Sequence, residues 1–194
     1  MDKPAGPTSH DVVARARRVF GTRAVGHSGT LDPFATGLLV LLVGRATRLA
    51  RFVEAEAKSY LARARLGVAT TTDDLTGEEL PNGREPSDPG LTGVAAALAT
   101  LLGPQRQRPP AFSAKQVGGV RSYVRARRGE VVVLPETEVV IHALEVVGYE
   151  FPYLQFRATV SAGTYIRALA RDLGERLGVG AHLTALRREA VGSL

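Results

Sequence analysis

The sequence is organised around a glycine-punctuated loop, GHSGTLDPFATG, which runs from Gly26 to Gly37. At its centre stands the pair Asp32-Pro33. Proline disfavours the α region for the residue before it, so Asp32 is expected on an extended turn, and the glycines let the backbone bend sharply. His27 and Thr30 belong to the same loop, and either could serve a site with Asp32. The pair is also typical of a helix start, with Asp32 as N-cap and Pro33 in the first turn.

The segments on both sides of this loop predict an α+β fold. Before it, apolar positions from Val12 to Phe20 follow the helical period, with Thr8 or Ser9 as the cap and Gly21 as the stop. After it, strands are expected over residues 59–68, 138–147 and 153–160, and helices over residues 92–102 and 164–177. Because there is no regular βαβ alternation, we expect a mixed, mostly antiparallel sheet flanked by helices.

Two further segments are not predicted to form regular elements. Residues 70–90 are rich in Thr, Asp, Pro and Gly and indicate a long exposed connection. Residues 104–129 carry seven Lys or Arg side chains and no acid. A segment so charged and so poor in apolar residues is expected to be mobile on its own.

The charge of the chain is positive and comes mostly from arginine. The net charge is +6, and Lys3, Lys58 and Lys115 are the only lysines among 25 basic residues. Arginine suits planar, bidentate contact with phosphate, which favours a polyanionic partner. A GC-rich genome that encodes Arg in place of Lys would give the same composition, so charge alone leaves both interpretations open.

Composition also excludes several classes of site. The 194 residues include no cysteine, which rules out disulfides, thiolate zinc sites and cysteine nucleophiles. The four histidines show no metal-ligand spacing. Hydrophobic residues make up 44%, enough for a core, but no apolar run reaches the ~18 residues of a membrane span, and the N-terminus has no signal-peptide pattern. We therefore expect a cytoplasmic protein of one domain without a metal.

Four separated blocks, in order along the chain, resemble the tRNA pseudouridine synthase B family. The first is Asp2 to Ser9, and the second is the loop Gly26 to Gly37, which is similar to the motif of the family's catalytic aspartate. The third comprises Lys58-Ser59-Tyr60, Gly67 and residues 74–77. The last runs from Gly163-Thr164-Tyr165-Ile166-Arg167 to Leu186-Arg187-Arg188.

The resemblance implies an RNA-modifying isomerase of the pseudouridine synthase fold. Its substrate would be a uridine in the T-loop of tRNA, which must be flipped out of the RNA stack. Asp32 would be the essential carboxylate, acting either as a nucleophile or as a base that starts an elimination. The family's reaction implies no cofactor, metal or ATP.

The resemblance also assigns roles to single residues. Arg167 would be the partner that keeps Asp32 ionised, and Tyr60 would lie against the flipped base and assist proton transfer from carbon 5. His27 would fill the space that the base leaves, and Tyr165 and Leu186 would line the pocket. Taken without the resemblance, these are an arginine on a solvated helix face, a core tyrosine and a histidine that satisfies loop backbone groups.

The basic segment 104–129 is similar to the RNA-clasping insertion of the family. It is expected to order on the T-arm of tRNA, with arginines on phosphate: Arg121, Arg125, Arg127 and Arg128. The alternative is a merely solvated charge run. Residues 1–194 would then form the catalytic domain, without the C-terminal RNA-binding PUA domain that many relatives carry, as a fragment or a minimal member. We expect a monomer with no obligate protein partner.

Two other functions remain open at this point. A guide-RNA-dependent pseudouridine synthase of the same superfamily shares the aspartate motif. A non-catalytic RNA-binding or RNA-folding module could keep the scaffold, but it would not need Asp32 together with Tyr60 and Arg167.

Overall fold

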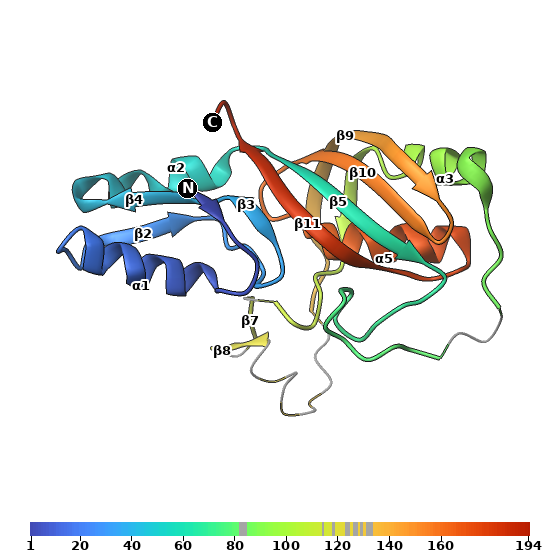
Figure 1. The fold of residues 1–194 in the computed structure, drawn as a ribbon, viewed down its shortest axis with the longest axis horizontal. Coiled ribbons are helices and arrows are strands. Elements are labelled where there is room, and N and C mark those ends of the chain that lie inside the picture. Colours follow the sequence, from blue (N-terminus) through green and yellow to red (C-terminus); the bar gives the residue numbers. More distant parts are fainter. Residues whose placement is uncertain are drawn as a thin grey trace.

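The computed structural model describes residues 1–81, 85–113, 115–117, 119–122, 125, 128, 130 and 134–194. Figure 1 shows two parts side by side, a small lobe built from segments of the N-terminal region and a larger part built on a long twisted sheet. N- and C-termini lie close together where the two parts meet. In the described residues no helix combines the length and the apolar character needed to span a membrane.

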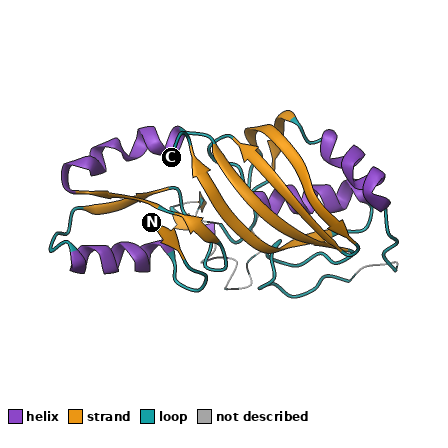
Figure 2. Cartoon of the chain, turned by 45° about the horizontal axis from the view of Figure 1, so that its top comes forward, coloured by secondary structure: helices purple, strands orange, loops and turns teal. Residues whose placement is uncertain are grey.

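A seven-stranded sheet forms the larger part, in the order β1-β3-β11-β5-β10-β9-β6. The pair β3 and β11 is parallel and the other five pairs are antiparallel. The expected α+β fold with a mixed, mostly antiparallel sheet flanked by helices is therefore confirmed (Figure 2). The strands are β1 (Asp2–Lys3), β3 (Thr36–Leu38), β5 (Lys58–Leu66), β6 (Gly103–Gln107), β9 (Thr137–Glu150), β10 (Tyr153–Val160) and β11 (Ala181–Val191).

The strand β11 holds the sheet together and was not predicted. It lies between β3 and β5, so it joins the segment that follows the Asp32 loop to the central strands. Its pairing with β5 shifts register twice, between Leu183 and Ala185 and between Arg188 and Ala190. Such irregularities break the strict alternation by which a strand is recognised in a sequence.

The small lobe contains a second, two-stranded sheet with helices on both sides. The strands are β2 (Val25–Ser28) and β4 (Val40–Val43), and the Asp32 loop with β3 connects them. The helix α1 (Ser9–Val19) lies on one side, while the 3-10 helix η1 (Gly44–Leu49) and α2 (Ala50–Ala55) lie on the other (Figure 1). As expected, Thr8 caps α1, in a reciprocal capping box with Asp11.

Two helices pack near the large sheet. The helix α5 (Ile166–Leu177) buries an apolar stripe of Ile166, Leu169, Ala170 and Leu173, and it ends at Gly178 in the left-handed conformation. The helix α3 (Gly90–Ala99) begins after Pro89, before the predicted start at Thr92, and also ends earlier than predicted. Both helices contribute side chains to the main core, together with β5, β9 and β10.

Two predictions about the connections need correction. Residues 70–90 are not exposed throughout, because Thr70, Thr72 and Asp74 are buried and Asp74 forms a bridge to Leu183 of β11. The basic segment does not start as an unstructured chain either, since β6 pairs with β9 along its whole length. Farther on, β7 (Gln116–Val117) and β8 (Val120–Arg121) form a small antiparallel pair.

Candidate active site

Asp32 lies on a turn and not at the start of a helix. The amide of Ala35 donates to the Asp32 carbonyl, which closes the turn. Ser9, at the start of α1, fixes the preceding residue, because its Oγ accepts from the amide of Leu31 and donates to the Leu31 carbonyl. Lys3, which has no exposed surface, donates to the carbonyl of Pro33. The loop is thus held on both sides of Asp32, and the N-cap alternative is excluded.

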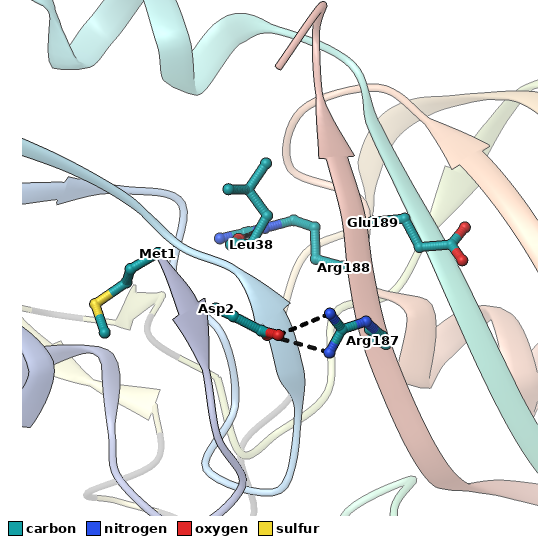
Figure 3. Close-up of a pocket in the computed structure, with 6 residues that line it drawn as sticks. All are labelled: Met1, Asp2, Leu38, Arg187, Arg188 and Glu189. Carbon is teal, nitrogen blue, oxygen red and sulfur yellow. Dashed lines mark hydrogen bonds and ion pairs between the residues drawn. The ribbon is translucent and has the colours of Figure 1, made fainter.

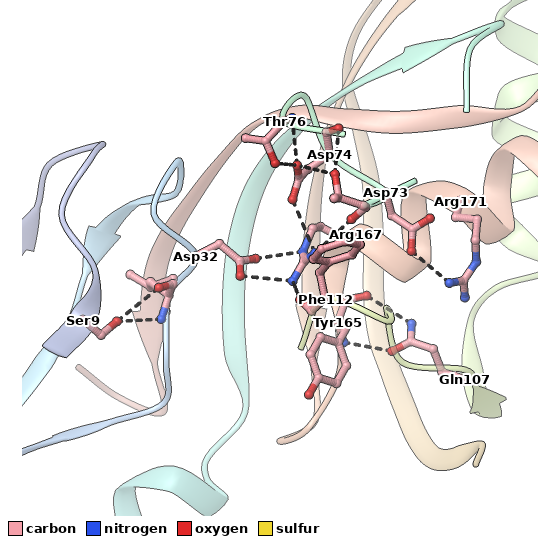
Figure 4. Close-up of polar contacts among 12 residues, drawn as sticks. Ser9, Asp32, Asp73, Asp74, Thr76, Gln107, Phe112, Tyr165, Arg167 and Arg171 are labelled. Atoms are coloured by element: carbon pink, nitrogen blue, oxygen red, sulfur yellow. Dashed lines mark hydrogen bonds and ion pairs between the residues drawn. The ribbon is translucent and has the colours of Figure 1, made fainter. Parts of the chain in front are cut away.

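The guanidinium of Arg167 meets this carboxylate with two of its nitrogens (Figure 4). Nη2 donates to Oδ1 at 3.1 Å, and Nε lies 2.9 Å from Oδ2. The Arg167 side chain is only 4% exposed, whereas that of Asp32 is 33% exposed. A buried fork that holds an accessible carboxylate leaves that carboxylate available to a ligand. Arg167 is therefore not an arginine on a solvated helix face, which is what the sequence would suggest without the family resemblance.

Arg167 also fastens the loop at residues 70–77 and the start of the basic segment. Its Nη1 lies 3.4 Å from Oδ2 of Asp74 and donates to the Thr72 carbonyl at 2.9 Å. Its Nη2 donates to the Phe112 carbonyl at 2.9 Å. The other oxygen of Asp74 accepts from Thr72 and Thr76. One guanidinium thus joins two carboxylates and two backbone carbonyls from three separate segments.

Opposing effects act on the pKa of Asp32. Burial raises the pKa, and the neighbouring charge of Asp74 raises it further. The charge and hydrogen bond of Arg167 lower it, as does the charge of Lys3. The net direction is upward from the ordinary value of a carboxyl. Arg167 and Lys3 are therefore the groups that work against protonation of Asp32.

Tyr60 is buried in β5 and lies close enough to Asp32 for their charges to interact. Burial raises the pKa of Tyr60, the charge and a hydrogen bond of Arg188 lower it, and the charge of Asp32 raises it. Tyr60 lies directly across from Arg188 of β11. The structure therefore brings together Asp32, Arg167 and Tyr60, the three side chains predicted for the chemistry.

Tyr165 and Leu186 lie on elements that frame this group. Tyr165 is half-buried at the N-cap of α5, and the charges of Arg167 and Asp32 both affect its pKa, which burial raises. Leu186 is a buried residue of β11 in the same hydrophobic cluster as Leu31, the neighbour of Asp32. Both positions agree with pocket walls.

His27 belongs to the small lobe and lies half-buried on β2. Its ring packs edge-on against that of His10, with 5.6 Å between ring centroids. Burial and the charges of His10 and Arg188 lower the pKa of His27. Its Nδ1 is buried and, in the described part of the chain, finds no hydrogen-bond partner.

The arginines predicted to clasp RNA are only partly described. Arg127 lies outside the described residues, and of Arg121 only the backbone, in β8, is described. Arg125 pairs with Glu130 at 3.2 Å, and Arg128 is exposed. Their relation to the Asp32 group therefore stays a prediction.

Gln107, at the end of β6, is a site residue that the sequence analysis missed. Its Oε1 accepts from the amide of Tyr165 at 2.8 Å, and its Nε2 donates to the Tyr165 carbonyl at 3.2 Å (Figure 4). The side chain is buried and so ties the start of the basic segment to the start of α5. A polar residue between arginines gives no pattern from which such a contact could be predicted.

Comparison with known proteins agrees with this geometry. The mixed, mostly antiparallel sheet flanked by helices agrees with the fold that the resemblance implies. Residues 17–166 match the family described as "TruB family pseudouridylate synthase (N terminal domain)". Proteins named tRNA pseudouridine synthase B are 53% identical in Thermobifida fusca and 50% identical in Leifsonia xyli, each over 99% of this chain. The chain belongs to the TruB family of pseudouridylate synthases.

Solved structures give the same fold at lower identity. A Cbf5-Nop10-Gar1 complex contains a chain 32% identical to this one, with a TM-score of 0.73 over 96% of this chain. An H/ACA RNP bound to a substrate RNA containing 2'-deoxyuridine contains one that is 29% identical, with a TM-score of 0.70. This chain spans 68% and 66% of the two curated relatives and 46% of each structural relative.

Proposed function

We propose that this chain converts a uridine in the T-loop of tRNA into pseudouridine. The observation that carries the proposal is the partly exposed carboxylate of Asp32, which two nitrogens of a buried arginine hold in place. This carboxylate is also near enough to Tyr60 for its charge to raise the pKa of the phenol. A module that only bound RNA would have no need of a buried cation aimed at an accessible acid. The names of the relatives, which are about half identical over nearly the whole chain, supply the substrate.

The reaction breaks the bond between N1 of the base and C1′ of the ribose and forms a bond between C5 and C1′. A proton leaves C5 and one is gained at N1, so the reaction is balanced without an added co-reactant. Asp32 either attacks the nucleotide or removes a proton to start an elimination, and both routes need its ionised form. Arg167 favours that form, and Tyr60 is assigned the proton of C5.

The RNA contacts belong to the same proposal. The target base is extruded from the stack at a cost of a few kcal/mol, and His27 occupies the space that it leaves. The buried Nδ1 of His27, which has no hydrogen-bond partner among the described residues, supports this assignment, because such a nitrogen is costly unless a ligand completes it. Tyr165 and Leu186 line the pocket.

We assign the clasp on T-arm phosphates to Arg121, Arg125, Arg127 and Arg128. Arg125 exchanges its partner Glu130 for phosphate. Removing the clasp should lower RNA affinity and flatten the salt dependence of binding, whereas an unchanged salt slope would contradict the assignment.

A guide-RNA-dependent synthase is the second candidate, because the structural relatives include an H/ACA RNP. The chain is 28–32% identical to these structural relatives and 48–53% identical to the tRNA enzymes, which favours the tRNA enzyme. We assign it an action without a guide RNA, as a monomer.

The test uses RNA with tritium at carbon 5 of uridine. We expect the chain alone to release tritium from a T-arm hairpin and to release none from a hairpin whose T-loop uridine is replaced by cytidine. Nucleoside analysis of the product should show pseudouridine. Absence of release from the T-arm at saturating protein would overturn the proposal, and release only with an added guide RNA would favour the second candidate.

A further inference from the structure

Arg188 of β11 is a buried cation to which the proposed reaction assigns no role. It is 1% exposed and is the largest fully buried side chain of the described residues. No carboxylate in the described part of the chain lies within ion-pair distance of its guanidinium. A buried charge without an opposite charge is costly, so its hydrogen bonds must hold it in place.

Those hydrogen bonds connect the two ends of the Asp32 loop. Nη2 of Arg188 donates to the carbonyl of Gly29 at 3.0 Å, three residues before Asp32. Nε donates to the carbonyl of Leu38 at 2.7 Å, six residues after it. Figure 3 shows the Arg188 side chain turned towards Leu38, whereas its neighbour Arg187 points to Asp2. One guanidinium therefore bridges the segment that carries the catalytic carboxylate.

The glycines of the loop fit closely around this bridge. A Cβ atom added to Gly29 would lie 3.1 Å from Nη1 of Arg188 and 3.3 Å from Cε of Lys58. A Cβ atom on Gly37 would lie 2.2 Å from the carbonyl oxygen of Arg188. Both glycines also have positive φ angles. The loop thus has the shape that lets it approach Arg188 from both ends.

Arg188 also stands opposite Tyr60, the second side chain to which the proposed reaction assigns a role. Arg188 faces Tyr60 across the β11–β5 ladder, and its charge and hydrogen bond lower the pKa of the Tyr60 phenol. Lys58, two residues before Tyr60 and also buried, donates to the carbonyls of Glu54 and Glu56. Arg188 therefore bonds to the Asp32 loop and stands opposite Tyr60 on the neighbouring strand.

We propose that Arg188 is a positioning residue for pseudouridine formation, which sets the Asp32 loop and the Tyr60 hydroxyl in one fixed relation. It does not touch the substrate. It acts by holding the loop at Gly29 and Leu38 while it faces Tyr60 across the β11–β5 ladder. The proposal rests on the function proposed above and adds a residue that the reaction needs without contacting it.

The matched test compares Arg188→Lys with Arg187→Lys. Both arginines are consecutive on β11, but Arg187 is exposed and forms its bidentate pair with Asp2. Lysine keeps the charge, but its single ammonium group cannot stand at the positions of both Nε and Nη2, so we expect it to lose the contact with Gly29 or with Leu38. We expect Arg188→Lys to lower the single-turnover rate of tritium release on the order of a hundredfold, because a small misplacement of reacting groups has that effect. RNA affinity should stay unchanged, and Arg187→Lys should match the wild type.

Hydrogen exchange separates positioning from general destabilisation. Arg188→Lys should raise amide exchange within residues 29–38 and leave α5 and β9 as protected as in the wild type. If Arg188→Lys releases tritium at the wild-type rate, or if exchange rises equally throughout the chain, the proposal is wrong. If the wild type itself releases no tritium, the proposed function fails, and the exchange pattern still tests whether Arg188 braces the loop.

Discussion

Two buried arginines flank the Asp32 loop, and their surroundings differ. Arg167 of α5 contacts two carboxylates, those of Asp32 and Asp74. Arg188 of β11 contacts backbone carbonyls and faces Tyr60 across the ladder, with no acid at ion-pair distance in the part of the chain that the structure describes. Both are almost completely removed from water.

The difference indicates that the two arginines have different roles, one in the protonation state of Asp32 and one in its position. A cation between two acids stabilises their ionised forms, so Arg167 acts on the charge of Asp32. A cation that bonds to carbonyls on both sides of Asp32 fixes the path of the loop backbone. We therefore expect Arg188 to set the position of the Asp32 carboxylate. We therefore expect replacement of Arg167 to shift the pH dependence of the reaction, and replacement of Arg188 to lower the rate by displacing Asp32.

The largest effect of a change that leaves Asp32 intact is expected for Arg167→Met. Two carboxylates would lose their shared cation, so the pKa of Asp32 would rise further above its ordinary range. We expect kcat to fall about a hundredfold or more, as when a charge-stabilising donor is lost. The acid limb of the pH–rate profile should also move to higher pH, because a larger part of Asp32 is then protonated.

The control for this change is Arg171→Met, one turn along the same helix. Arg171 pairs with Asp73 and donates to the carbonyl of Arg108, so its loss should alter KM for RNA more than kcat. Equal pH–rate profiles for Arg167→Met and the wild type would refute the charge role of Arg167.

A smaller effect is expected for Gln107→Leu. This change tests whether the hydrogen bonds of Gln107 to the backbone of Tyr165 help to position Arg167, two residues further along α5. Leucine would leave the amide of Tyr165 without its partner, whereas the Tyr165 carbonyl would keep its bond from the Leu169 amide, so we expect a cost of roughly 1–3 kcal/mol in stability. The start of α5 should shift, and kcat should fall about tenfold. Gln105→Leu is the matched control on β6, because Gln105 donates to Leu101 instead. Thermal unfolding and single-turnover rates would be measured for both, and identical behaviour of the two variants would contradict the assignment.

The smallest effect on activity is expected for Asp73→Asn, the acid of the second arginine pair. Burial raises the pKa of Asp73 to about 6. Because the folded state then binds this proton more tightly than the unfolded chain, the group adds stability as the pH falls from about 6 towards 4. Asparagine removes that contribution, so the variant should gain stability relative to the wild type as the pH rises from 4 to 7. Urea unfolding at several pH values would show this, and a constant difference would contradict it.

The same contrast explains what the sequence could and could not predict. The helix over α1, the strands β5, β9 and β10 and the helix α5 have clear periodicity and were predicted to within a few residues. The strand β11 is broken by two register shifts and was missed. The Asp-Pro pair and the glycines predicted a sharp, extended turn at Asp32, but they left the N-cap alternative open, and the role of Asp32 was assigned through the resemblance to the family motif.

The residues that hold Asp32 in place were harder to predict than Asp32 itself. Arg167 was assigned through the family motif alone, since an arginine on a helix gives no sign of burial. Asp74 lies in a stretch of polar residues that looks exposed, and only the fold shows that Arg167 and the threonines around it satisfy its oxygens. Gln107 and Arg188 bond to backbone carbonyls and amides, which every residue has, so no sequence pattern predicted these contacts, although Arg188 lies within the last block that resembles the family.

The central claim, that the carboxylate of Asp32 does the chemistry and does not merely hold the fold, is tested most directly with Asp32→Asn. Asparagine keeps the shape of the side chain and removes its charge. Tritium release from C5-labelled T-arm RNA would be followed under single-turnover conditions at RNA-saturating protein, together with RNA affinity. We predict that the variant binds the RNA as tightly as the wild type and releases no tritium. Release at a rate near that of the wild type would contradict the account.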